Sequence, residues 1–585
     1  MINLRPLVLL VFVTIVLPAR YGQERRQQLP ITGRVIDTAG RPVAGTFVDL
    51  VPVGSPVKSA LRHETNEEGK FSFDGLSTGA YSLLVEDLSK LDFFTDVQSD
   101  NFAGPRFWRP GDFAELVVPI EKPGIITGRV TGPTGEPVVE AIVRAFKVRD
   151  RQGRRVQSLS PLGDTIWQRK TDDRGIYRIW WLDPGAYMIS VGGAPSGGLT
   201  FRAPSPTDYD NDAPTYYSGS PLGEPTAVTV GPQAEVNGID IQYRGGSGHA
   251  ISGTLSWKPA SGSGSTRVYL TNAATGAQQS DYLLNDRPPS FTFAKLPDGD
   301  YDIVAIADMP GHQDEIASRT VRATVKGTDL TGITLEPMAF ASAAGRIVID
   351  STSDQTYKQD CHGKRPAVIE EVVLVLKGDP ATLGPSSMER HDRSAFALAV
   401  DSNGAFAAPR LNPGTYSISA DLPDDRLYLS AITAPAPASR AVSASGGLTI
   451  KGGGHVSPLV ISLRMGAATL NGRIALPELA APLSSVRVYL VPLDPAEADN
   501  PLRFGETSIK AGGAFTFAHV APGQYKVLAR PVAEGVERQL GETRQGRALL
   551  RRAAQRNGVK IQLQQCQKLV DLALKYTEGQ LTLGQ

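Results

Sequence analysis

The chain has 585 residues, enough for several domains of ordinary size, and its 60 Lys and Arg residues balance 60 Asp and Glu residues. Without a basic excess the chain lacks the charge that nucleic-acid binding requires, and two cysteines exclude a disulfide-rich scaffold or a multi-cysteine zinc site. The 60 Gly and 43 Pro residues are many, but 41% hydrophobic residues suffice for several cores. The composition therefore predicts a large, neutral, turn-rich protein of several domains.

The first 22 residues have the pattern of a secretory signal peptide. Arg5 precedes an apolar run over residues 7–17, and Pro18-Ala19 leads into a polar segment. The run is short for a transmembrane helix, and an uncleaved N-terminal anchor is the alternative interpretation. We find no later membrane-spanning segment, so we expect an exported protein that is periplasmic, on the outer surface or extracellular.

A pattern of the form Leu/Val-x-x-Gly-x-Tyr occurs five times in the rest of the chain. Each tyrosine follows an aromatic residue by ten positions, and successive tyrosines lie 106 to 115 residues apart. A glycine within a short apolar segment opens each copy. The tyrosines are Tyr81, Tyr187, Tyr301, Tyr416 and Tyr525, and the opening glycines are Gly33, Gly128, Gly253, Gly345 and Gly472. A constant core with variable spacers at this period predicts a tandem array of whole domains.

The local pattern within each copy is that of β-structure. Phe71-Ser72-Phe73 and its counterparts alternate apolar and polar residues, and Gly and Pro turns separate the short segments. We therefore expect an all-β fold of about five Ig-like or prealbumin-like antiparallel β-sandwiches. Each repeated tyrosine is expected to bury its ring while its hydroxyl ties a neighbouring loop. The predicted domains are residues 23–121, 122–246, 247–340, 341–465 and 466–585.

The last domain departs from the pattern because a short helix is predicted between Gly541 and Asn557, with Asn557-Gly558 as its C-cap. Residues 559–563 and 569–574 then resemble a final hairpin. Residues 526–568 contain ten Lys and Arg but three Glu. Two interpretations of this segment stay open: the solvated face of a packed helix, or contact with an anionic glycan or lipid surface.

The sequence resembles carboxypeptidase regulatory-like domains. The resemblance rests on the Gly33-Arg34-Val35 opening with Asp37, Gly40 and Pro42, on the turn at residues 171–175, and on the Leu-x-Pro-Gly-x-Tyr return. It is strongest in the first two domains and implies a transthyretin-like or carbohydrate-binding-like sandwich, common as tandem copies in exported bacterial proteins. In carboxypeptidases this sandwich is an appendage, and we find no peptidase domain here.

The resemblance also raises the question of isopeptide bonds, which related collagen-adhesin B-type sandwiches form. Those domains use a Lys in the first strand and a Glu four residues after the tyrosine. Four copies here have Arg in the opening strand, and Val or Ala follows every tyrosine at that distance. The arginines are Arg34, Arg129, Arg346 and Arg473. Self-crosslinking is therefore not expected.

Motifs for catalysis are not apparent in the sequence. The seven histidines lack the spacing of a zinc carboxypeptidase site, and neither a Gly-x-Ser-x-Gly nucleophile motif nor a phosphate-binding loop occurs. We therefore predict a non-enzymatic protein without metal or cofactor, the alternative being a hydrolase within the fourth domain. Cys361 and Cys566 either pair after export or stay unpaired.

The candidate binding site lies in the second domain. Trp180 is predicted to face outward beside Arg178, where an indole could stack on a sugar ring. Tyr216 and Tyr217, in the long loop at residues 192–223, are further candidates, as are Trp108 and Trp167 near other loops. The alternative is that Trp180 packs under that loop or against a neighbouring domain.

The sequence thus predicts an exported binding protein that recognises a polysaccharide or glycan at the cell envelope. The alternative is a structural or adhesive stalk or scaffold that contacts envelope proteins. A stalk of five tandem domains predicts an elongated particle.

Overall fold

The computed structural model describes most of the chain between residues 29 and 575. The described residues are 29–37, 39–55, 59–87, 93–95, 107–111, 115–120, 123–149, 167–182, 184–193, 207–218, 225–257, 265–274, 278–283, 290–308, 316–350, 368–378, 395–434, 447–475, 486–509, 511–531 and 540–575. The predicted signal peptide at residues 1–22 and Cys361 lie outside them.

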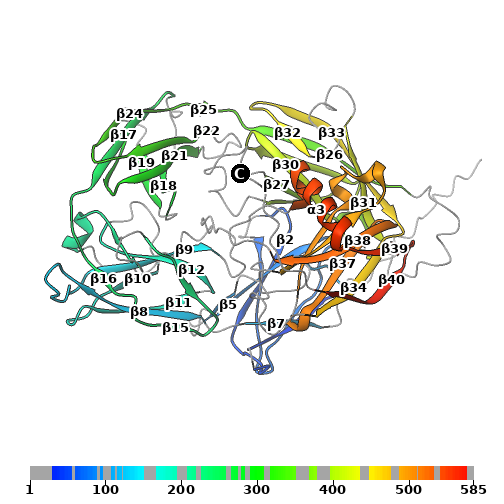
Figure 1. Ribbon diagram of the computed structural model, residues 1–585, viewed down its shortest axis with the longest axis horizontal. Helices are drawn as coiled ribbons and strands as arrows, with labels where there is room; N and C mark the ends of the chain where they lie inside the picture. The colour runs from blue at the N-terminus through cyan, green and yellow to red at the C-terminus, as the bar shows by residue number, and fades with distance from the viewer. Residues whose placement is uncertain are drawn as a thin grey trace, which may run out of the picture.

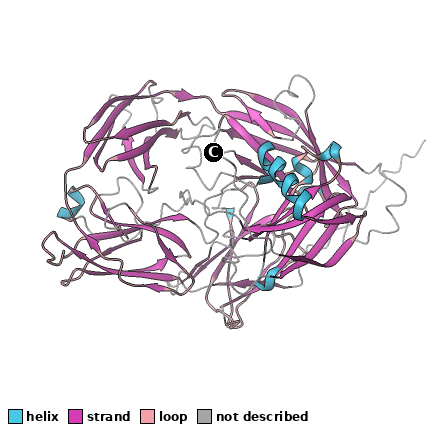
Figure 2. Cartoon of the chain, viewed as in Figure 1, coloured by secondary structure: helices cyan, strands magenta, loops and turns pink. Residues whose placement is uncertain are grey.

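Within these residues the strands form ten sheets, two for each sequence repeat. Each pair of sheets encloses its own apolar core, and Figure 2 shows strands throughout and little helix. The predicted all-β array of sandwiches with a short helix near the C-terminus is confirmed. We call the sandwiches units 1 to 5 in chain order.

The elements of the units have the following bounds. Unit 1 contains β1 (Ile31–Ile36), β2 (Phe47–Pro52), β3 (Leu61–Glu64), β4 (Lys70–Phe73), β5 (Tyr81–Asp87), β6 (Phe93–Thr95) and β7 (Leu116–Pro119). Unit 2 contains β8 (Gly124–Thr131), β9 (Ile142–Arg149), β10 (Trp167–Lys170), β11 (Ile176–Leu182), β12 (Gly185–Val191), the 3-10 helix η2 (Asp208–Asn211), β13 (Thr215–Tyr216), β14 (Val228–Val230), β15 (Glu235–Val236) and β16 (Ile241–Gln242). Unit 3 contains β17 (His249–Leu255), β18 (Ser265–Asn272), β19 (Gln278–Leu283), β20 (Ser290–Leu296), β21 (Gly299–Asp308), β22 (Ile316–Ser318), β23 (Val321–Val325), β24 (Leu330–Leu335) and β25 (Pro337–Met338).

The last two units follow the same order. Unit 4 contains β26 (Ala341–Asp350), the 3-10 helix η3 (Ile369–Glu371), β27 (Val373–Gly378), β28 (Ala395–Ala399), β29 (Ala405–Leu411), β30 (Gly414–Asp421), β31 (Leu427–Thr433), β32 (Leu448–Ile450) and β33 (His455–Met465). Unit 5 contains β34 (Ala468–Ala475), β35 (Val486–Pro492), β36 (Gly505–Ser508), β37 (Ala514–Val520), β38 (Gly523–Pro531), α3 (Arg544–Asn557), β39 (Val559–Leu563) and β40 (Lys568–Lys575).

The opening strand has the same neighbours in every unit. It pairs antiparallel with the strand that carries the aromatic residue ten positions before the repeated tyrosine. It pairs parallel with the last strand of the sheet, which closes it. The second sheet is built on antiparallel pairs around the next long strand. The sandwiches are therefore mixed rather than purely antiparallel, because the closing strand arrives from the opposite sheet.

The opening glycines are explained by close approach of two neighbours. A Cβ on any of them would lie within 2.6 Å of a backbone oxygen of the closing segment, too close for a side chain. These oxygens belong to Leu116, Ile239, Ile333, Leu459 and Leu572. In units 1, 3 and 5 the ring of the aromatic residue on the adjoining strand also lies within 2.6 Å of that Cβ position. Glycine at this position lets the opening strand pack between its two partners.

The repeated tyrosines act as predicted. Each ring is at most 3% exposed, and in four units the hydroxyl donates to the carbonyl oxygen four residues earlier, at 2.7 to 2.8 Å. The pairs are Tyr81 with Ser77, Tyr301 with Pro297, Tyr416 with Asn412 and Tyr525 with Ala521. In the second copy the equivalent position, Asp183, lies outside the described residues. The hydroxyl therefore fastens the Gly turn to the core, as in a tyrosine corner.

The C-terminal segment confirms the helix but not the hairpin. The Thr543 hydroxyl accepts a hydrogen bond from the backbone N–H of Gly546 at the start of α3. Gly558 ends the helix in extended conformation, rather than in the left-handed conformation of a glycine C-cap. β39 pairs with β38 in one sheet and β40 pairs with β34 in the other, so the two strands do not form a hairpin. Each completes a separate sheet.

The units also contact one another. At the junction of units 2 and 3, Lys295 Nζ donates to the Asp210 carbonyl oxygen at 3.2 Å and to Asn211 Oδ1 at 3.1 Å. At the junction of units 4 and 5, His519 Nδ1 lies 2.9 Å from the Leu427 carbonyl oxygen.

Of the two cysteines, the described one, Cys566, is disulfide-bonded.

Unit 1 contacts unit 4, although two units separate them in the sequence. Figure 1 shows the chain passing from unit 1 (blue) through units 2 and 3 to unit 4, where β2 comes to lie near β27. The two units share a buried apolar cluster that contains Ala80, Phe107 and Val373. The array is therefore closed by this contact, and the elongated particle expected of a stalk is not the arrangement in this structure.

Candidate functional site

Trp180 lies on β11, at an edge of the unit 2 sandwich. Tyr177 and Ile179 of this strand are buried in the core, whereas Trp180 is half-buried on the outward side. The pairing of β11 with β8 shifts register between Ile179 and Leu182. Trp180 therefore faces outward, as the sequence predicted, from an irregular part of the strand.

The Trp180 ring is stacked against a cation from the other sheet. Arg169 on β10 places its guanidinium carbon 3.7 Å from the centroid of the indole ring. Both β10 and β11 are edge strands, so the stacked pair bridges the open side of the sandwich. Burial lowers the pKa of Arg169 from its ordinary value. One face of the indole is thus occupied by this cation–π contact.

Arg178 lies on the same outward surface as Trp180. Its guanidinium forms an ion pair with Glu235 of β15 at 3.4 Å, and both side chains are nearly half exposed. β15 lies on the far side of β8 from β11, so the pair crosses the central strand of the sheet. At this exposure the ion pair contributes little stability, and Arg178 can exchange partners with a ligand.

Tyr216 and Tyr217 belong to the other sheet of unit 2. Tyr216 pairs with Ser190 of β12, and the backbone N–H of Tyr217 donates to the Ile189 carbonyl oxygen at 2.8 Å. The Tyr217 ring packs against the unit 2 core. The structure therefore brings Trp180 together with Arg178 but places the two tyrosines on a separate surface, so the four predicted residues do not form one site.

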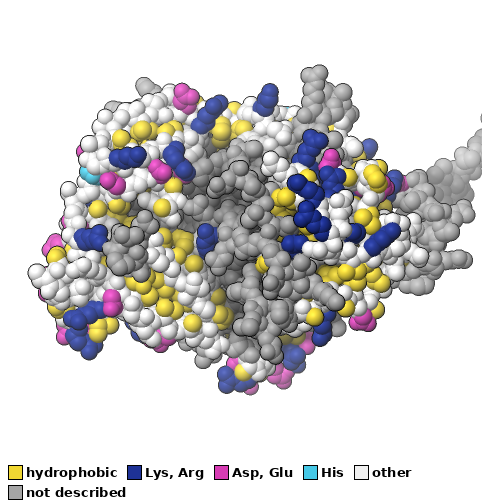
Figure 3. Space-filling view, in the orientation of Figure 1, with side chains coloured by type: hydrophobic (Ala, Val, Ile, Leu, Met, Phe, Trp, Pro, Cys, Tyr) yellow, Lys and Arg dark blue, Asp and Glu magenta, His cyan; other side chains and the backbone are white. Residues whose placement is uncertain are grey.

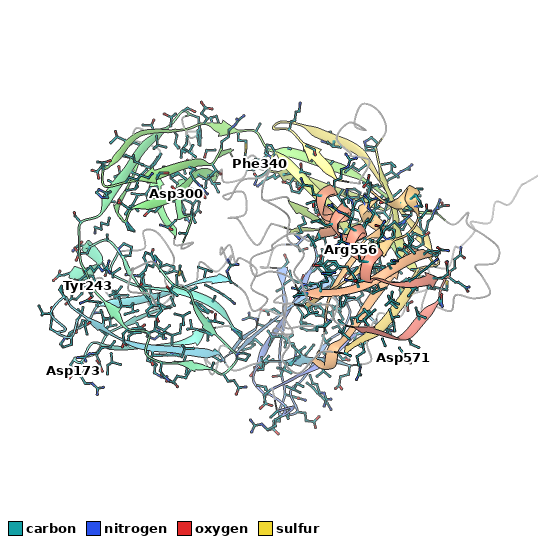
Figure 4. All side chains as sticks on the ribbon, in the orientation of Figure 1. Asp173, Tyr243, Asp300, Phe340, Arg556 and Asp571 are labelled. Atoms are coloured by element: carbon teal, nitrogen blue, oxygen red, sulfur yellow. The ribbon has the colours of Figure 1, made fainter. Side chains whose placement is uncertain are left out.

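A buried ion pair fixes the segment that carries these tyrosines. Arg144 on β9 is 2% exposed and donates to Asp210 Oδ1 of η2 at 2.6 Å and to the Gly192 carbonyl oxygen at 3.0 Å. Burial lowers the pKa of Arg144, while its hydrogen bond and charge interaction with Asp210 oppose that change. Tyr243 donates to the Asp212 carboxylate nearby, and Figure 4 shows Tyr243 on the side of unit 2 nearer unit 3. Residues 207–218 are thus tied to the unit 2 sandwich.

The contact between units 1 and 4 is centred on a second buried arginine. Arg109 is 3% exposed, and its Nε donates to the Glu371 carbonyl oxygen of η3 at 2.7 Å. One terminal nitrogen donates to the Asp421 carbonyl oxygen at 3.2 Å and to the Asp421 carboxylate. A guanidinium with this set of acceptors is compensated in a buried position. Trp108, a further sequence candidate, is 1% exposed in the unit 1 core and is not available to a ligand.

An apolar surface surrounds Arg109. Val373 and Val375 of β27 point to unit 1, while Leu374 and Leu376 between and beyond them belong to the unit 4 core. Ala80 and Phe107 of unit 1 pack against these valines, with Val53 and Ala397 also in contact. A strand that is apolar on both faces requires cover on both faces. Unit 1 supplies that cover for unit 4.

Sequence reasoning identified neither buried arginine. Each lies in an apolar segment, Arg109 after Phe107-Trp108 and Arg144 between Val143 and Ala145. A charged residue within such a run was the available signal for a buried ion pair. The acidic partner of Arg144, Asp210, lies 66 residues away, and that of Arg109, Asp421, lies 312 residues away. No local sequence pattern could have found these partners.

The comparisons with known proteins concern mainly the first unit. Residues 30–98 match the model of the carboxypeptidase regulatory-like domain. The predicted resemblance is thereby confirmed for unit 1, and units 2 to 5 share its strand pairing. No curated protein matches the chain.

Several solved structures show a distant likeness. GBS52, the minor pilin of Streptococcus agalactiae, is 15% identical, with 37% of this chain and 95% of that chain covered and a TM-score of 0.21. Two B repeat units of the collagen-binding protein of Staphylococcus aureus are 13% identical, with 74% and 99% covered and a TM-score of 0.13. The Bacillus anthracis TIE protein is 12% identical, with 74% and 73% covered and a TM-score of 0.15.

The described part of the chain contains neither a membrane-spanning helix nor a metal-binding cluster. No described helix is long and apolar enough to cross a membrane. No group of three or more described His, Cys, Asp and Glu side chains could hold a metal ion.

Proposed function

We propose that this chain is an exported, non-enzymatic scaffold whose sandwiches are locked together to present fixed surfaces to protein partners at the cell envelope. The observation that carries the proposal is the docking of unit 1 on unit 4 through the buried Arg109. A desolvated arginine with three acceptors on the other unit is specific for one geometry. A flexible string of domains has no need of such a contact.

The other junctions support the same role. Lys295 joins unit 3 to unit 2, and His519 joins unit 5 to unit 4, in each case through backbone carbonyl oxygens. Contacts to backbone atoms fix the position of one unit relative to the next. A rigid arrangement lowers the entropy cost of binding a partner that touches several units at once.

The test is crosslinking of the exported protein in its natural host, comparing wild type with Val373→Asp. We expect wild type to crosslink to discrete envelope proteins, and the variant, with its units folded but unit 1 released, to lose those products. Secretion of both proteins at equal levels is the control. Identical products from both proteins would contradict a role for the locked geometry.

A second candidate function, glycan binding, is favoured by the outward, half-buried indole of Trp180 beside the exposed Arg178. Stacking of a sugar would require the indole face opposite Arg169, or displacement of that guanidinium. A neutral polysaccharide array with wild type, Trp180→Ala and Arg169→Ala tests this role. Glycan binding at Trp180 predicts loss in the first variant and retention in the second, since removing Arg169 exposes the ring. Equal binding by all three proteins would exclude Trp180.

A further inference from the structure

The surface around α3 carries a concentration of positive charge. Residues 544–570 include seven Lys and Arg and no Asp or Glu. Figure 3 shows Lys and Arg side chains gathered over this part of the molecule, and Figure 4 labels Arg556 on the helix. The whole chain is neutral, so the rest of it carries an excess of acidic residues, and this positive charge is a local feature.

Most of these cations face solvent. The Arg544 side chain is 86% exposed, and Arg552, Arg556 and Lys560 are also exposed. Arg547 is the exception, because it is 3% exposed and donates to the Gly541 carbonyl oxygen at 2.9 Å. The exposed arginines are therefore held on a helix that one buried arginine helps to anchor.

Among the described residues, Asp499 pairs with arginines of α3, and Asp425 pairs with Lys568 of β40 at 3.3 Å. Asp499 lies 3.4 Å from Arg551 and 4.0 Å from Arg544. Burial lowers the pKa of Arg547, and the positive charges of Arg551 and Arg544 lower it further, while Asp499 opposes them. One carboxylate shared by two arginines leaves an excess of positive charge toward Arg552 and Arg556.

The apolar side of α3 is already covered. Leu550, Ala553 and Ala554 are buried against Tyr489 and its neighbours on the unit 5 sheet. An amphipathic helix that inserts into a lipid interface needs a free apolar face. Only the polar face of α3 is exposed, so the helix lacks the apolar surface that insertion into a bilayer requires.

The exposed cations are spread along the length of the helix. Arg544 and Arg556 are twelve residues apart, which corresponds to about 18 Å along an α-helix. Arg551 and Arg552 lie between them in the sequence, and Lys560 follows on β39. Guanidinium groups match carboxylate oxygens in pairs, which suits a linear ligand with carboxylates at intervals.

We infer that the exposed face of α3 together with Lys560 binds an acidic polysaccharide, a chain with repeated uronate carboxylates. Charge complementarity selects the ligand, and the spread of cations along the helix favours a polymer over a single small anion. This site is separate from Trp180 and does not depend on the docking of unit 1. It gives the scaffold a contact to an anionic matrix.

The test is binding of the full mature chain to immobilised polygalacturonate at low and high salt. The variant Arg552→Glu/Arg556→Glu reverses two exposed charges, and Lys326→Glu/Lys451→Glu reverses two exposed charges on units 3 and 4 as a matched control. We expect the helix variant to bind at least about tenfold more weakly and the control to bind as wild type, with wild-type binding weakened by salt. Arg552→Lys/Arg556→Lys should bind between the two, because it keeps the charge and loses the paired hydrogen bonds of the guanidinium groups.

Three results would overturn the inference. Equal weakening in the helix variant and the control would show a nonspecific effect of net charge. Loss of binding in Trp180→Ala but not in the helix variant would place the site on unit 2. Binding to vesicles of acidic phospholipid but not to polygalacturonate would make the surface a membrane contact.

Discussion

β27 of unit 4 and β35 of unit 5 hold the same place in their sandwiches, and each carries apolar side chains on both faces. Leu374 in β27 and Val488 in β35 belong to the inner cores, while Val373 and Tyr489 belong to separate clusters on the outer face. Their covers differ: β35 is covered by α3 of the same unit, and β27 by unit 1. The same sheet surface thus serves as an intra-domain core in one case and as a domain interface in the other.

The difference has a consequence for stability. A local cover such as α3 forms together with its own sandwich, so its loss should affect unit 5. A cover from a distant unit joins two separately folded sandwiches, so its loss should change the arrangement of the units. The following predictions test that distinction, from the largest expected effect to the smallest.

The substitution Val373→Asp should have the largest effect on the arrangement. It places a second carboxylate on the outer face of β27, where the one buried cation, Arg109, is already paired with Asp421. Burial of a charge without a cation of its own costs several kcal/mol, about enough to release unit 1. We expect faster hydrogen exchange at β28 and at the segment of Phe107 without loss of the unit 4 core. Leu374→Asp, one residue along and facing the core, should instead unfold unit 4. If the two variants behaved alike, Val373 and Leu374 would not lie on opposite faces of β27, one in the interface and one in the core.

The substitution Leu550→Ala should act locally. Leu550 is fully buried between α3 and the unit 5 sheet, and truncation of such a side chain costs about 2–5 kcal/mol. Hydrogen exchange should increase in α3 and β38 and stay unchanged at β27. The neighbouring exposed-face substitution Arg552→Ala is the control and should leave exchange in both regions as in wild type. Increased exchange at β27 in Leu550→Ala would contradict the separation of the two covers.

Arg109→Ala should weaken the docking by about 2–5 kcal/mol, because acceptors on unit 4 lose a buried donor. A double-mutant cycle with Asp421→Ala isolates the charged part of the contact. We expect the two substitutions to be strongly non-additive when the docking is measured by hydrogen exchange of β27. Additive effects would indicate that Arg109 and Asp421 do not interact in solution.

The smallest effect concerns pH. Burial raises the pKa of Tyr525 to about 12, whereas an unfolded tyrosine ionises near pH 10. The unfolded chain therefore loses the proton first, so this stabilisation is complete below about pH 10 and declines up to about pH 12, by roughly 3 kcal/mol in total. Tyr525→Phe should flatten this part of the profile of unfolding free energy against pH. An unchanged alkaline slope in the variant would contradict this role of Tyr525.

The repeated sandwich could be predicted from the sequence because its determinants are local. An aromatic residue and the tyrosine of the Gly-x-Tyr turn lie ten residues apart in every unit, and a glycine in a short apolar segment opens each unit. The outward position of Trp180 followed from the same alignment of strands. The failures concern pairing at a distance. Proximity in the sequence predicts a hairpin for the two strands after α3, whereas each of them completes a different sheet.

The stacking of Arg169 on Trp180 and the docking of Arg109 could not be predicted, because both join elements of different sheets or units. The run at residues 372–376 did contain a usable signal, since an uninterrupted apolar strand needs cover on both faces. The apolar run indicates that another segment covers the outer face of this strand, but it does not identify that segment. Val373 therefore marks an interface in the sequence, but its partner Phe107 can be found only in the structure.

The closed arrangement of the units is the central claim, and small-angle X-ray scattering of the mature chain tests it most directly. The account predicts a compact distribution of distances for wild type, and a longer maximum dimension for Val373→Asp at unchanged strand content. An extended wild-type profile that the substitution does not alter would contradict the docking of unit 1 on unit 4.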